Sequence, residues 1–468
     1  MTIKIRGAML VALSASLVLA TAACGSSGAP ASDTSQNASS DTSAAGSSAA
    51  DSASGDTSSQ APAESSSSAA GGEPVTMTLW TNATTGPGTE FFQNTIKAFE
   101  KENPNVTIQM QVVQNEDLDG KLQTALQGGQ GSAPDIFLQR GGGKLADMVK
   151  ANQLLDISDA IADDTKANVG AGAFAAEQVD GKTYAMPTSV LPGGFWYSQD
   201  VFKAAGVDTP PATLDDLNAA IGKLKDSGVA PIALGGKDGW PAGHWYYWFA
   251  LRDCSQDTLN ATASSLKFDD PCWLKAGQDL EKFAASKPFN EGFLTTSAQQ
   301  GAGSSAGMIA NHKAGMELMG AWDPGVIASL TPDEKPLPDL GFFPFVSVPG
   351  AQGDPAAIMG GVDAYSCSAW APKEACSAFL NYLVTTDVQE AYYQAFQAPP
   401  VNKQAQGVVT EPYLKSVIAA FNDAPYVSLW LDTLYGQAVG GALNDAVVAL
   451  LAGQGSPQDI IDAVNSAS

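Results

Sequence analysis

The 468-residue sequence is poor in histidine and contains no closely spaced cysteine pair. Its two histidines are His244 and His312, and neither an H-E-x-x-H motif nor a C-x-x-C motif occurs. Because zinc sites are built mainly from such residues, the sequence argues against zinc hydrolases and zinc-stabilised folds. We therefore expect no metal and no cofactor.

Basic residues are also scarce. The chain has 24 lysines and arginines against 49 acidic residues, which gives a formal net charge of −25. Nucleic acids and anionic lipid surfaces would repel such a chain, so we expect no nucleic-acid partner. A neutral ligand is compatible with this charge.

Residues 25–73 lack every aromatic residue and every leucine, isoleucine, valine, lysine and arginine. A segment of this composition buries too little apolar surface to offset the entropy lost on ordering. We therefore expect a flexible tether over residues 24–73. A globular body would begin at residue 74, and no later run is long and apolar enough to span a bilayer.

The first 23 residues have the pattern of a secretory signal. A basic start precedes an apolar run over about residues 8–20, which is shorter than the ~20 residues that span a bilayer comfortably. The small residues before Cys24 resemble a bacterial lipobox, which implies cleavage after residue 23 and a lipid on Cys24. Thr21 stands where such sites usually have leucine, and ordinary secretory cleavage beside a coincidental cysteine is the alternative.

Four further cysteines lie in the body. An exported protein can form disulfides, and the pairings that close the shortest loops are Cys254 with Cys272 and Cys367 with Cys376. Each cysteine lies near a predicted turn or the end of a predicted element. We therefore expect both bridges.

The body opens with alternating strand and helix patterns. Residues 75–80 and 106–113 alternate in hydrophobicity, residues 90–103 carry apolar side chains at helical spacing, a second helix is expected over 117–127, and residues 133–139 form a short apolar strand. This βαβαβ order predicts a parallel sheet with right-handed crossovers.

Polar and aromatic residues follow each of these three strands. Ligands of parallel sheets bind at the carboxyl ends of the strands. The candidates to bind a ligand there are Trp80, Asn82, Glu116, Asp117, Gln139 and Arg140. The alternative for any one of them is that it only solvates a loop.

Aromatic residues are concentrated in WPAGHWYYWF, residues 240–249, of a chain that is 8% aromatic. Four consecutive aromatic residues, from 245 to 248, must point all the way round a helix. We therefore expect some of them to face something other than the core. The alternative is that the whole cluster is buried, as aromatic residues commonly are.

Three stretches further along carry a resemblance to a known family: FWYSQDVFKAAGVDTPPATLDDL, GMELMGAWDPGV and SAWAPKEACSAFLNYLVTTDVQEAYY. With the lipobox-like start, they resemble the extracellular solute-binding lipoproteins of ABC sugar importers, the class that includes maltose-binding protein. The resemblance covers essentially all of residues 74–468. It implies an α/β fold of two lobes joined by hinge crossings, with a sugar held in the cleft between the lobes.

The resemblance also implies an organisation and partners. Lobe one would be residues 74–187 plus 325–390, and lobe two residues 188–324 plus 391–468. We expect a monomer, lipid-anchored on the extracellular face of the bacterial cytoplasmic membrane, that delivers ligand to the membrane subunits of an ABC permease.

Sugar chemistry indicates which residues would line the cleft. A pyranose has an apolar C–H face and a ring of hydroxyls, which suit flat aromatic surfaces and charged or amide groups. Trp322 and Trp430 match cleft aromatics of the family. From the aromatic cluster we expect Trp240 and one or two of Trp245, Tyr246 and Trp248 in the cleft, with Tyr247 or Phe249 packed inward.

Two further candidates have open alternatives. His244 lies inside the aromatic cluster and is expected either to donate to a sugar hydroxyl or to make a local structural hydrogen bond. Asp363 follows Gly360 and Gly361 at a predicted strand end, where glycines either let the chain pass close to a ligand or mark a turn.

Enzymatic interpretations find little support. GSSAG, residues 303–307, matches the G-x-S-x-G nucleophile motif but follows TTSAQQGA instead of a β-branched strand. A glycosidase would need two positioned carboxylates, which so acidic a sequence supplies in many combinations. We predict a non-enzymatic receptor; a secreted glycoside hydrolase and a surface adhesin are the alternatives.

The number of aromatic residues favours stacking of two or more sugar rings, and hence an oligosaccharide. General similarity to relatives of this class makes xylobiose or short xylo-oligosaccharides the first expectation. α-1,6-Linked galactosides or glucosides, such as raffinose, come next.

Overall fold

A computed structural model describes residues 73–468 of the chain. The predicted signal, the predicted lipidation site Cys24 and all but the last residue of the predicted tether lie outside the described residues. None of the helices in residues 73–468 combines the length and apolar character needed to cross a bilayer.

The first three strands form the predicted parallel βαβαβ unit. Strand β1 (Val75–Thr81) pairs in parallel with β2 (Val106–Val112) on one side and with β3 (Ile136–Gln139) on the other. Helices α1 (Gly86–Glu102) and α2 (Asn115–Gly128) make the crossovers. The prediction of this unit is confirmed.

Helix α1 shows how the sequence specifies these elements. The Thr85 hydroxyl accepts a hydrogen bond from the Gly88 N–H at the start of the helix, and Asn103 caps its end. Phe92, Ile96 and Phe99, at helical spacing, are buried against the sheet.

One continuous sheet extends from this unit. The strand order is β2-β1-β3-β10-β6-β8-β7, while β11 pairs with β10 and β9 with β6. These further strands are β6 (Ala185–Ser198), β7 (Ala230–Ala233), β8 (Ala314–Gly320), β9 (Leu340–Phe343), β10 (Ile358–Cys367) and β11 (Val427–Leu429). A separate small hairpin joins β4 (Gln178–Val179) and β5 (Lys182–Thr183).

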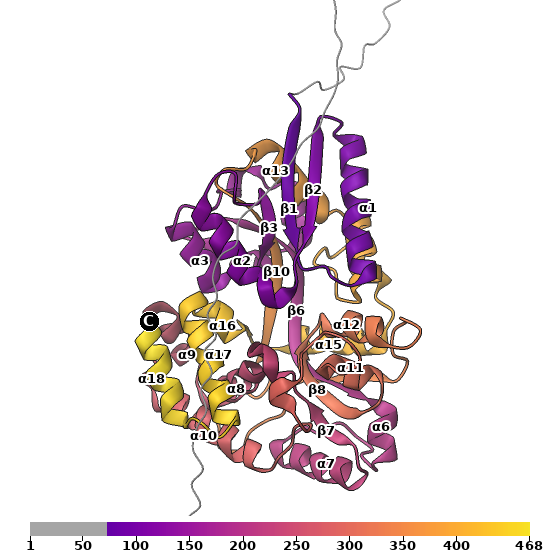
Figure 1. Cartoon of the computed structure of the whole chain (residues 1–468), viewed down its shortest axis with the longest axis vertical. Coiled ribbons are helices and arrows are strands. Elements are labelled where there is room, and N and C mark those ends of the chain that lie inside the picture. The colour runs from indigo at the N-terminus through magenta and orange to yellow at the C-terminus, as the bar shows by residue number, and fades with distance from the viewer. Residues whose placement is uncertain (1–72) are drawn as a thin grey trace, which may run out of the picture. The chain divides into compact units, whose positions relative to one another are not determined.

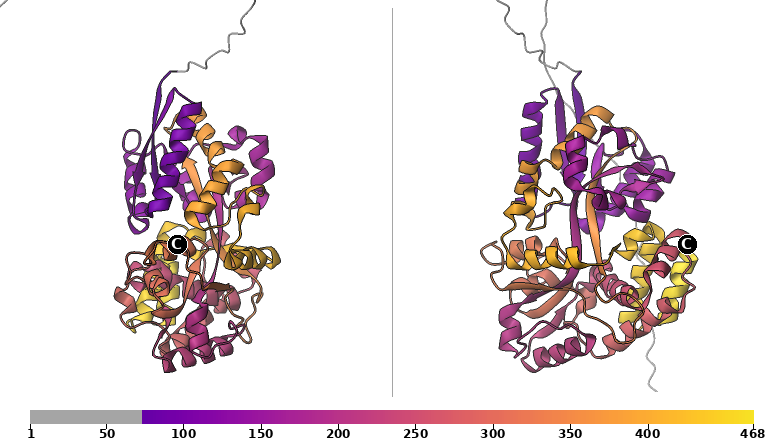
Figure 2. Two further views of the ribbon diagram at one scale, coloured as in Figure 1. Left: turned by 90° about the vertical axis from the view of Figure 1, so that its right-hand side faces the viewer. Right: turned by 180° about the vertical axis from the view of Figure 1, so that it is seen from behind.

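Strand β6 is shared by two halves of the sheet. Its first part pairs antiparallel with β10, and its second part pairs antiparallel with β8 and β9. Figures 1 and 2 show β6 and β10 running between two lobes, each built of strands covered by helices. This confirms the predicted two-lobed α/β fold.

The other helices cover the faces of the two halves. In chain order they are α3 (Gly142–Lys150), α4 (Asp163–Val169), α5 (Ala171–Ala175), α6 (Gln199–Ala204), α7 (Leu214–Asp226), α8 (Trp240–Asp253), α9 (Gln256–Ser265), α10 (Pro271–Ala285), α11 (Ser305–Ala310), α12 (Asp323–Leu330), α13 (Lys373–Leu383), α14 (Thr386–Phe396), α15 (Pro412–Asp423), α16 (Leu431–Leu434), α17 (Gln437–Leu451) and α18 (Pro457–Ala467). Short 3-10 turns are η1 (Ser158–Ala160), η2 (Gly236–Asp238), η3 (Phe293–Thr295) and η4 (Ala405–Val408).

Two disulfides join neighbouring elements. Cys254 at the end of α8 is bonded to Cys272 at the start of α10, and Cys367 at the end of β10 is bonded to Cys376 in α13. Both predicted pairings are confirmed.

Two later strands have limits that bear on the site. Strand β9 ends at Phe343, because Pro344 follows and has no N–H to donate. Strand β10 runs from Ile358 to Cys367, so Asp363, predicted to lie at a strand end, lies within the strand. The predicted residue limits of the two lobes remain predictions. Strand β9 falls within the range predicted for lobe one, but it pairs with the second part of β6, which falls within the range predicted for lobe two.

Candidate functional site

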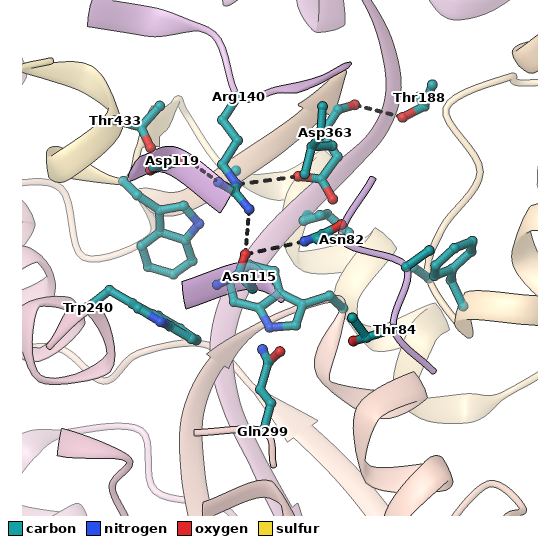
Figure 3. A pocket seen from close by; sticks show the side chains of 18 of the residues that line it. Asn82, Thr84, Asn115, Asp119, Arg140, Thr188, Trp240, Gln299, Asp363 and Thr433 are labelled. Atoms are coloured by element: carbon teal, nitrogen blue, oxygen red, sulfur yellow. Dashed lines mark hydrogen bonds and ion pairs between the residues drawn. The ribbon is translucent and has the colours of Figure 1, made fainter. Parts of the chain in front are cut away.

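A cavity of about 390 Å³ opens where the carboxyl ends of β1, β2 and β3 face the second half of the molecule. Its walls come from both lobes and include loops after β1 and β3, helices α2, α8 and α17, and strand β10. Figure 3 shows polar side chains on one side of this cavity and Trp240 with Gln299 on the other. It is the place at which parallel α/β sheets usually bind ligands.

Aromatic rings form one wall of the cavity. The ring centroids of Trp240 and Trp322 are 6.0 Å apart, and those of Trp322 and Trp430 are also 6.0 Å apart. His244 contacts all three indoles and stacks on that of Trp430. The wall therefore offers several ring faces and edges within the span of a small ligand.

Glycines make room for two of these indoles. A methyl group at Gly320 would lie 1.9 Å from the Trp322 ring, and one at Gly193 would lie 2.4 Å from the Trp430 ring. Gly361 of β10 also lies against the Trp430 indole. A side chain at Gly193 or Gly320 would clash with an indole, so these glycines leave the space that the rings occupy.

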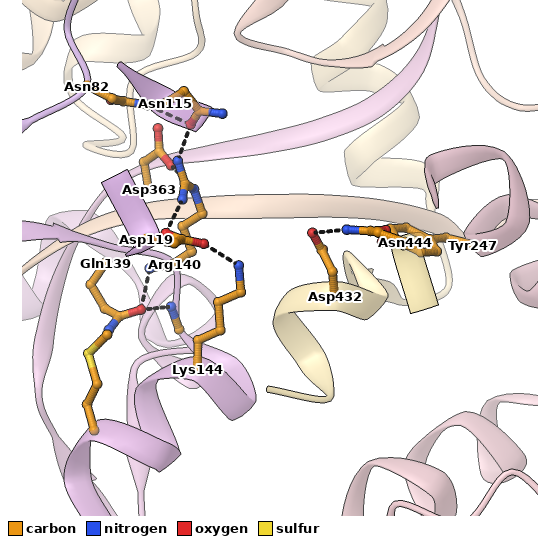
Figure 4. Close-up of polar contacts among 12 residues, drawn as sticks. Asn82, Asn115, Asp119, Gln139, Arg140, Lys144, Tyr247, Asp363, Asp432 and Asn444 are labelled. Carbon is orange, nitrogen blue, oxygen red and sulfur yellow. Dashed lines mark hydrogen bonds and ion pairs between the residues drawn. The ribbon is translucent and has the colours of Figure 1, made fainter. Parts of the chain in front are cut away.

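The opposite wall carries a polar cluster centred on Arg140. Its guanidinium donates to the Asn115 side-chain oxygen at 2.6 Å and to Asp119 at 3.3 Å, and its Nε lies 3.8 Å from a carboxylate oxygen of Asp363. The Asn82 amide donates to the same Asn115 oxygen at 3.3 Å. Figures 3 and 4 show these groups converging from β3, α2, β10 and the loop after β1.

Charge pairing favours the ionised forms of Asp119 and Arg140, whereas burial outweighs the effect of Arg140 on Asp363 and raises the pKa of that carboxyl. Burial favours the neutral form of Asp119, but Lys144, which donates to it at 2.7 Å, and Arg140 outweigh burial and lower its pKa. Burial likewise disfavours the Arg140 cation, yet Asp119 and Asp363 raise its pKa. The cavity wall thus presents fixed charges that strengthen hydrogen bonds to hydroxyl groups.

Several polar atoms facing this region have no partner. The indole N–H groups of Trp240, Trp322 and Trp430 are buried and make no hydrogen bond within residues 73–468, and the same is true of His244 Nδ1 and one carboxylate oxygen of Glu116. All five side chains line the cavity. Since buried polar groups are normally paired, each of these atoms retains unused hydrogen-bonding capacity beside the cavity.

One end of the cavity is apolar. Phe91, Phe92, Tyr392 and Phe396 line it and contact one another, with ring centroids 4.6–6.3 Å apart. This end can hold an apolar surface of a ligand.

A direct contact joins opposite rims of the cavity. The Gln300 amide donates to a carboxylate oxygen of Glu116 at 3.0 Å. Glu116 lies in the first turn of α2, in the first half of the molecule, whereas Gln300 lies in the loop before α11. The two residues are 184 positions apart in the sequence.

Most of the predicted site residues meet in this cavity. Those that line it are Asn82, Glu116, Arg140, Trp240, His244, Trp322, Asp363 and Trp430.

The structure places the other four predicted residues elsewhere. Trp245 is 1% exposed and packs in the core against Phe283 and Phe289. Asp117 is exposed and forms an ion pair with Lys121 at 3.0 Å.

Trp80 is half-buried among core residues and does not line the cavity. The Gln139 side-chain oxygen accepts from the backbone N–H groups of Arg140 and Gly141 at 2.6 and 3.1 Å, so Gln139 supports the turn that presents Arg140.

The structure buries all three residues, Trp245, Tyr246 and Trp248, of which one or two were expected in the cleft. The physical reason is that α10, α17 and β8 pack around α8. A helix surrounded by packing partners buries every face, so consecutive aromatic residues need no ligand. The expected inward packing of Tyr247 and Phe249 is observed for both.

Other cavity residues were not predicted. Asp119 and Lys144 belong to the ion cluster, and Asp432 and Asn444 lie opposite them (Figure 4). Helical spacing was a usable signal for Asp119, one turn after Asn115. For Asn444, the signal was the spacing Gln437, Gly440, Gly441 and Asn444 along one helix face.

The described residues offer no support for a metal or a nucleophile elbow. Within residues 73–468, no group of three or more His, Cys, Asp or Glu side chains could hold a metal ion. Ser305, the central serine of GSSAG, is buried and bonds to Glu317 and the Ala298 carbonyl. It is therefore not an exposed nucleophile on a strand-to-helix turn.

Known proteins share this sequence pattern and fold. The sequence profile for bacterial extracellular solute-binding protein matches residues 83–390. An uncharacterized ABC transporter extracellular-binding protein of Pyrococcus horikoshii is 27% identical over 389 residues, 78% of this chain and 81% of the relative. A multiple sugar-binding protein of Streptococcus mutans is 26% identical over 72% of this chain and 77% of the relative. A solved structure concerned with xylan utilization by Caldanaerobius polysaccharolyticus superposes with a TM-score of 0.76 at 25% identity, covering 84% of this chain and 99% of that chain.

Proposed function

The chain belongs to the bacterial extracellular solute-binding protein family, and from this premise we propose that it is the substrate-binding component of an ABC importer for oligosaccharides. In this function the protein captures its ligand between the lobes and releases it unchanged to a permease. It performs no chemical step.

One observation carries the proposal: buried, unpartnered hydrogen-bonding atoms lie beside aromatic rings in a single cavity. The three indole N–H groups of Trp240, Trp322 and Trp430 and one Glu116 oxygen lack partners within residues 73–468. An oligosaccharide would offer C–H faces to the rings and hydroxyls to these atoms. A purely apolar ligand would leave the polar atoms unpaired at a cost of about 1–3 kcal/mol each.

The ion cluster supports a neutral, hydroxyl-rich ligand. Arg140 is already paired with Asp119 and Asp363, so it does not require an anionic ligand to balance its charge. Carboxylates and guanidinium groups form the stronger, charge-assisted hydrogen bonds to hydroxyls.

The contact between Glu116 and Gln300 supports lobe closure as part of the mechanism. A ligand that binds both walls stabilises the closed form by its differential affinity for that form. The permease could then distinguish loaded from empty protein. Small-angle scattering that shows no compaction on saturation with a bound sugar would count against closure.

We propose xylobiose or short xylo-oligosaccharides as the first ligand class, and α-1,6-linked galactosides or glucosides such as raffinose as the second. The name of the Streptococcus mutans relative supports a sugar ligand, and the xylan context of the Caldanaerobius structure supports the xylose-based class. The aromatic wall, with room for more than one ring face, supports an oligosaccharide over a monosaccharide.

We also propose that a lipid on Cys24 anchors a monomeric protein to the extracellular face of the cytoplasmic membrane, beside the ABC permease membrane subunits. The sequence of residues 1–73 supports this assignment. Mass spectrometry of protein purified from bacterial membranes is expected to find a lipidated cysteine as the first residue, and an unmodified Cys24 would contradict it.

The deciding experiment is isothermal titration of residues 74–468 with xylo-, gluco-, galacto- and manno-oligosaccharides. Saturable binding of one linkage class is the expected result, and it would identify the ligand. Absence of binding across the panel would contradict the proposal.

The alternatives predict different outcomes. A glycoside hydrolase would release reducing sugar from the bound oligosaccharide over hours, whereas the receptor returns it intact. A surface adhesin would show no saturable binding of any small sugar.

A further inference from the structure

A second cavity of about 270 Å³ adjoins the first between helices α2 and α3. Five residues line both cavities and form the wall between them: Asp119, Leu138, Arg140, Lys144 and Gln437. In the view of Figure 4, Asp119 and Lys144 lie between Gln139, which lines the second cavity, and Asp432, which lines the first. The two cavities are thus neighbours across one charged wall.

The shared wall still has hydrogen-bonding capacity. Lys144 Nζ carries three N–H donors, and its one hydrogen bond within residues 73–468 is to Asp119. The Lys144 side chain is 13% exposed, so its free donors face confined space. These donors can bind a ligand hydroxyl while the ion pair with Asp119 stays in place.

The lining of the second cavity combines an apolar floor with amide groups. Leu122, Leu126 and Met148 form the apolar part, and the amides come from Gln123, Gln127, Gln139, Gln153 and Gln437. An apolar surface bordered by amides matches the apolar face and hydroxyl rim of a pyranose.

The charges that line this cavity balance. Asp119 and Asp147 supply two negative charges, and Arg140 and Lys144 supply two positive charges. The cavity therefore provides no net positive charge for a uronic acid or a phosphate, and a neutral sugar is the ligand that fits.

We propose that the second cavity is a subsite for one additional neutral sugar ring, which extends the ligand beyond the part held by the aromatic wall. This inference rests on the proposed oligosaccharide-binding function and deepens it, because it makes chain length a determinant of affinity. The protein would then favour tri- or tetrasaccharides over the disaccharide of the same linkage.

The test compares a short and a long sugar on the purified protein. Isothermal titration uses xylobiose and xylotetraose, or raffinose and stachyose if the panel assigns α-1,6-galactosides. In the unmodified protein the longer sugar should bind on the order of tenfold more tightly, which corresponds to about 1.4 kcal/mol.

Two adjacent substitutions on α2 make a matched pair. Both positions are exposed on α2, but Gln123 lines the second cavity and Thr124 lines neither cavity. Gln123→Trp therefore places a large side chain at the second cavity, whereas Thr124→Trp places the same side chain outside both. Gln123→Trp should remove the tenfold preference for the longer sugar and leave binding of the shorter one. Thr124→Trp should retain the preference, and retained binding of the shorter sugar shows that each variant is folded.

The outcomes separate this inference from the proposed function. If the short sugar binds the unmodified protein but the longer one gains no affinity, or if Gln123→Trp retains the gain, the second subsite is wrong and the receptor function stands. If neither sugar nor any other in the panel binds, the proposed function itself fails, and the subsite with it.

Discussion

The imidazole of His244 stacks on the indole of Trp430, with ring centroids 3.9 Å apart and planes inclined by 13°. His244 comes from α8 and Trp430 from the residue before α16, so the stack joins two segments far apart in the sequence. Burial lowers the pKa of His244 to about 3. The ring is therefore neutral at physiological pH and fixes the Trp430 indole at the cavity wall.

This stack predicts a specific acid sensitivity. In the unfolded chain His244 takes up a proton near its ordinary pKa of about 6.5, but in the folded protein it does so only near 3. Between these values the unfolded state binds more protons, so stability falls as pH falls. His244→Phe, which keeps a flat ring, should lose less free energy of unfolding between pH 6.5 and 3 than the unmodified protein in urea titrations.

The second histidine of the chain stays unchanged in that comparison. His312 hydrogen-bonds to Asp339 and contributes to the lowered pKa of that carboxyl, so replacing it would itself alter the acid sensitivity. Equal pH dependence in His244→Phe and the unmodified protein would show that His244 does not contribute.

Loss of an aromatic wall residue should weaken sugar binding. Trp322→Ala removes a ring that contacts both Trp240 and Trp430, and we expect a loss of roughly 10- to 100-fold in affinity, or about 1.4–2.8 kcal/mol. Titration calorimetry with the sugar found in the panel measures it. The control is Trp80→Ala, at a half-buried tryptophan outside the cavity, which should lower stability but leave affinity within about twofold. Equal losses of sugar affinity in Trp322→Ala and Trp80→Ala would count against a role of the aromatic wall.

Trp245 should matter for stability and not for binding. Its ring packs against Phe195, Phe283 and Phe289 in the core, so Trp245→Ala is expected to cost about 3–5 kcal/mol of unfolding free energy. The milder Trp245→Phe should remain folded at 25 °C and bind sugar like the unmodified protein. A selective loss of affinity in Trp245→Phe would instead place this residue at the ligand.

A buried acidic pair predicts a stability change in the opposite pH direction. Glu317 accepts from the Ser305 hydroxyl, while both Asp323 oxygens lack partners within residues 73–468. Burial raises both pKa values, and the Asp323 charge further raises that of Glu317. The unfolded carboxyls ionise near pH 4, so above this pH the pair progressively lowers stability until the folded-state pKa values are passed.

Asp323→Asn tests the pair because it removes one ionising group and nearly keeps the shape. Thermal unfolding should show a smaller loss of Tm between pH 4 and 8 than in the unmodified protein, with a gain of about 2 °C at pH 8. The exposed Asp333, which is paired with Lys335, offers the control Asp333→Asn. Asp333→Asn should keep the pH dependence of the unmodified protein. If Asp323→Asn also kept it, the pair would not titrate with folding.

Local sequence patterns were sufficient for the first half of the site. Alternating apolar residues specified β1 and β2, and capping residues specified the ends of α1. Because parallel strands place their carboxyl ends at one edge, the positions of Asn82, Glu116 and Arg140 beside the cavity followed from the predicted order of elements. The two disulfides followed from short loop lengths in the same way.

Interactions between distant segments were beyond local patterns. The role of Gln139 as a backbone support depends on the geometry of the turn at Arg140 and Gly141. Asp117 and Asp119 are close in the sequence, but only Asp119 lies on the side of α2 that faces the cavity. Leu118, Leu122 and Leu126 show which face of α2 packs inward, but not which of its polar residues meets Arg140 and Lys144 from a distant part of the chain.

By itself the sequence determined the βαβαβ unit that opens the first lobe, the disulfides and the family, because these depend on short-range periodicity, loop length and recognisable motifs. Only the tertiary structure decided which aromatic residues of 240–249 face the cavity, because packing partners enclose α8 and, of these residues, only Trp240 and His244 near its start line the cavity. It also brought Arg140, Asp119, Lys144 and Asp363 into one ion cluster, since their mutual distances depend on how the strands and helices pack and not on their spacing in the chain.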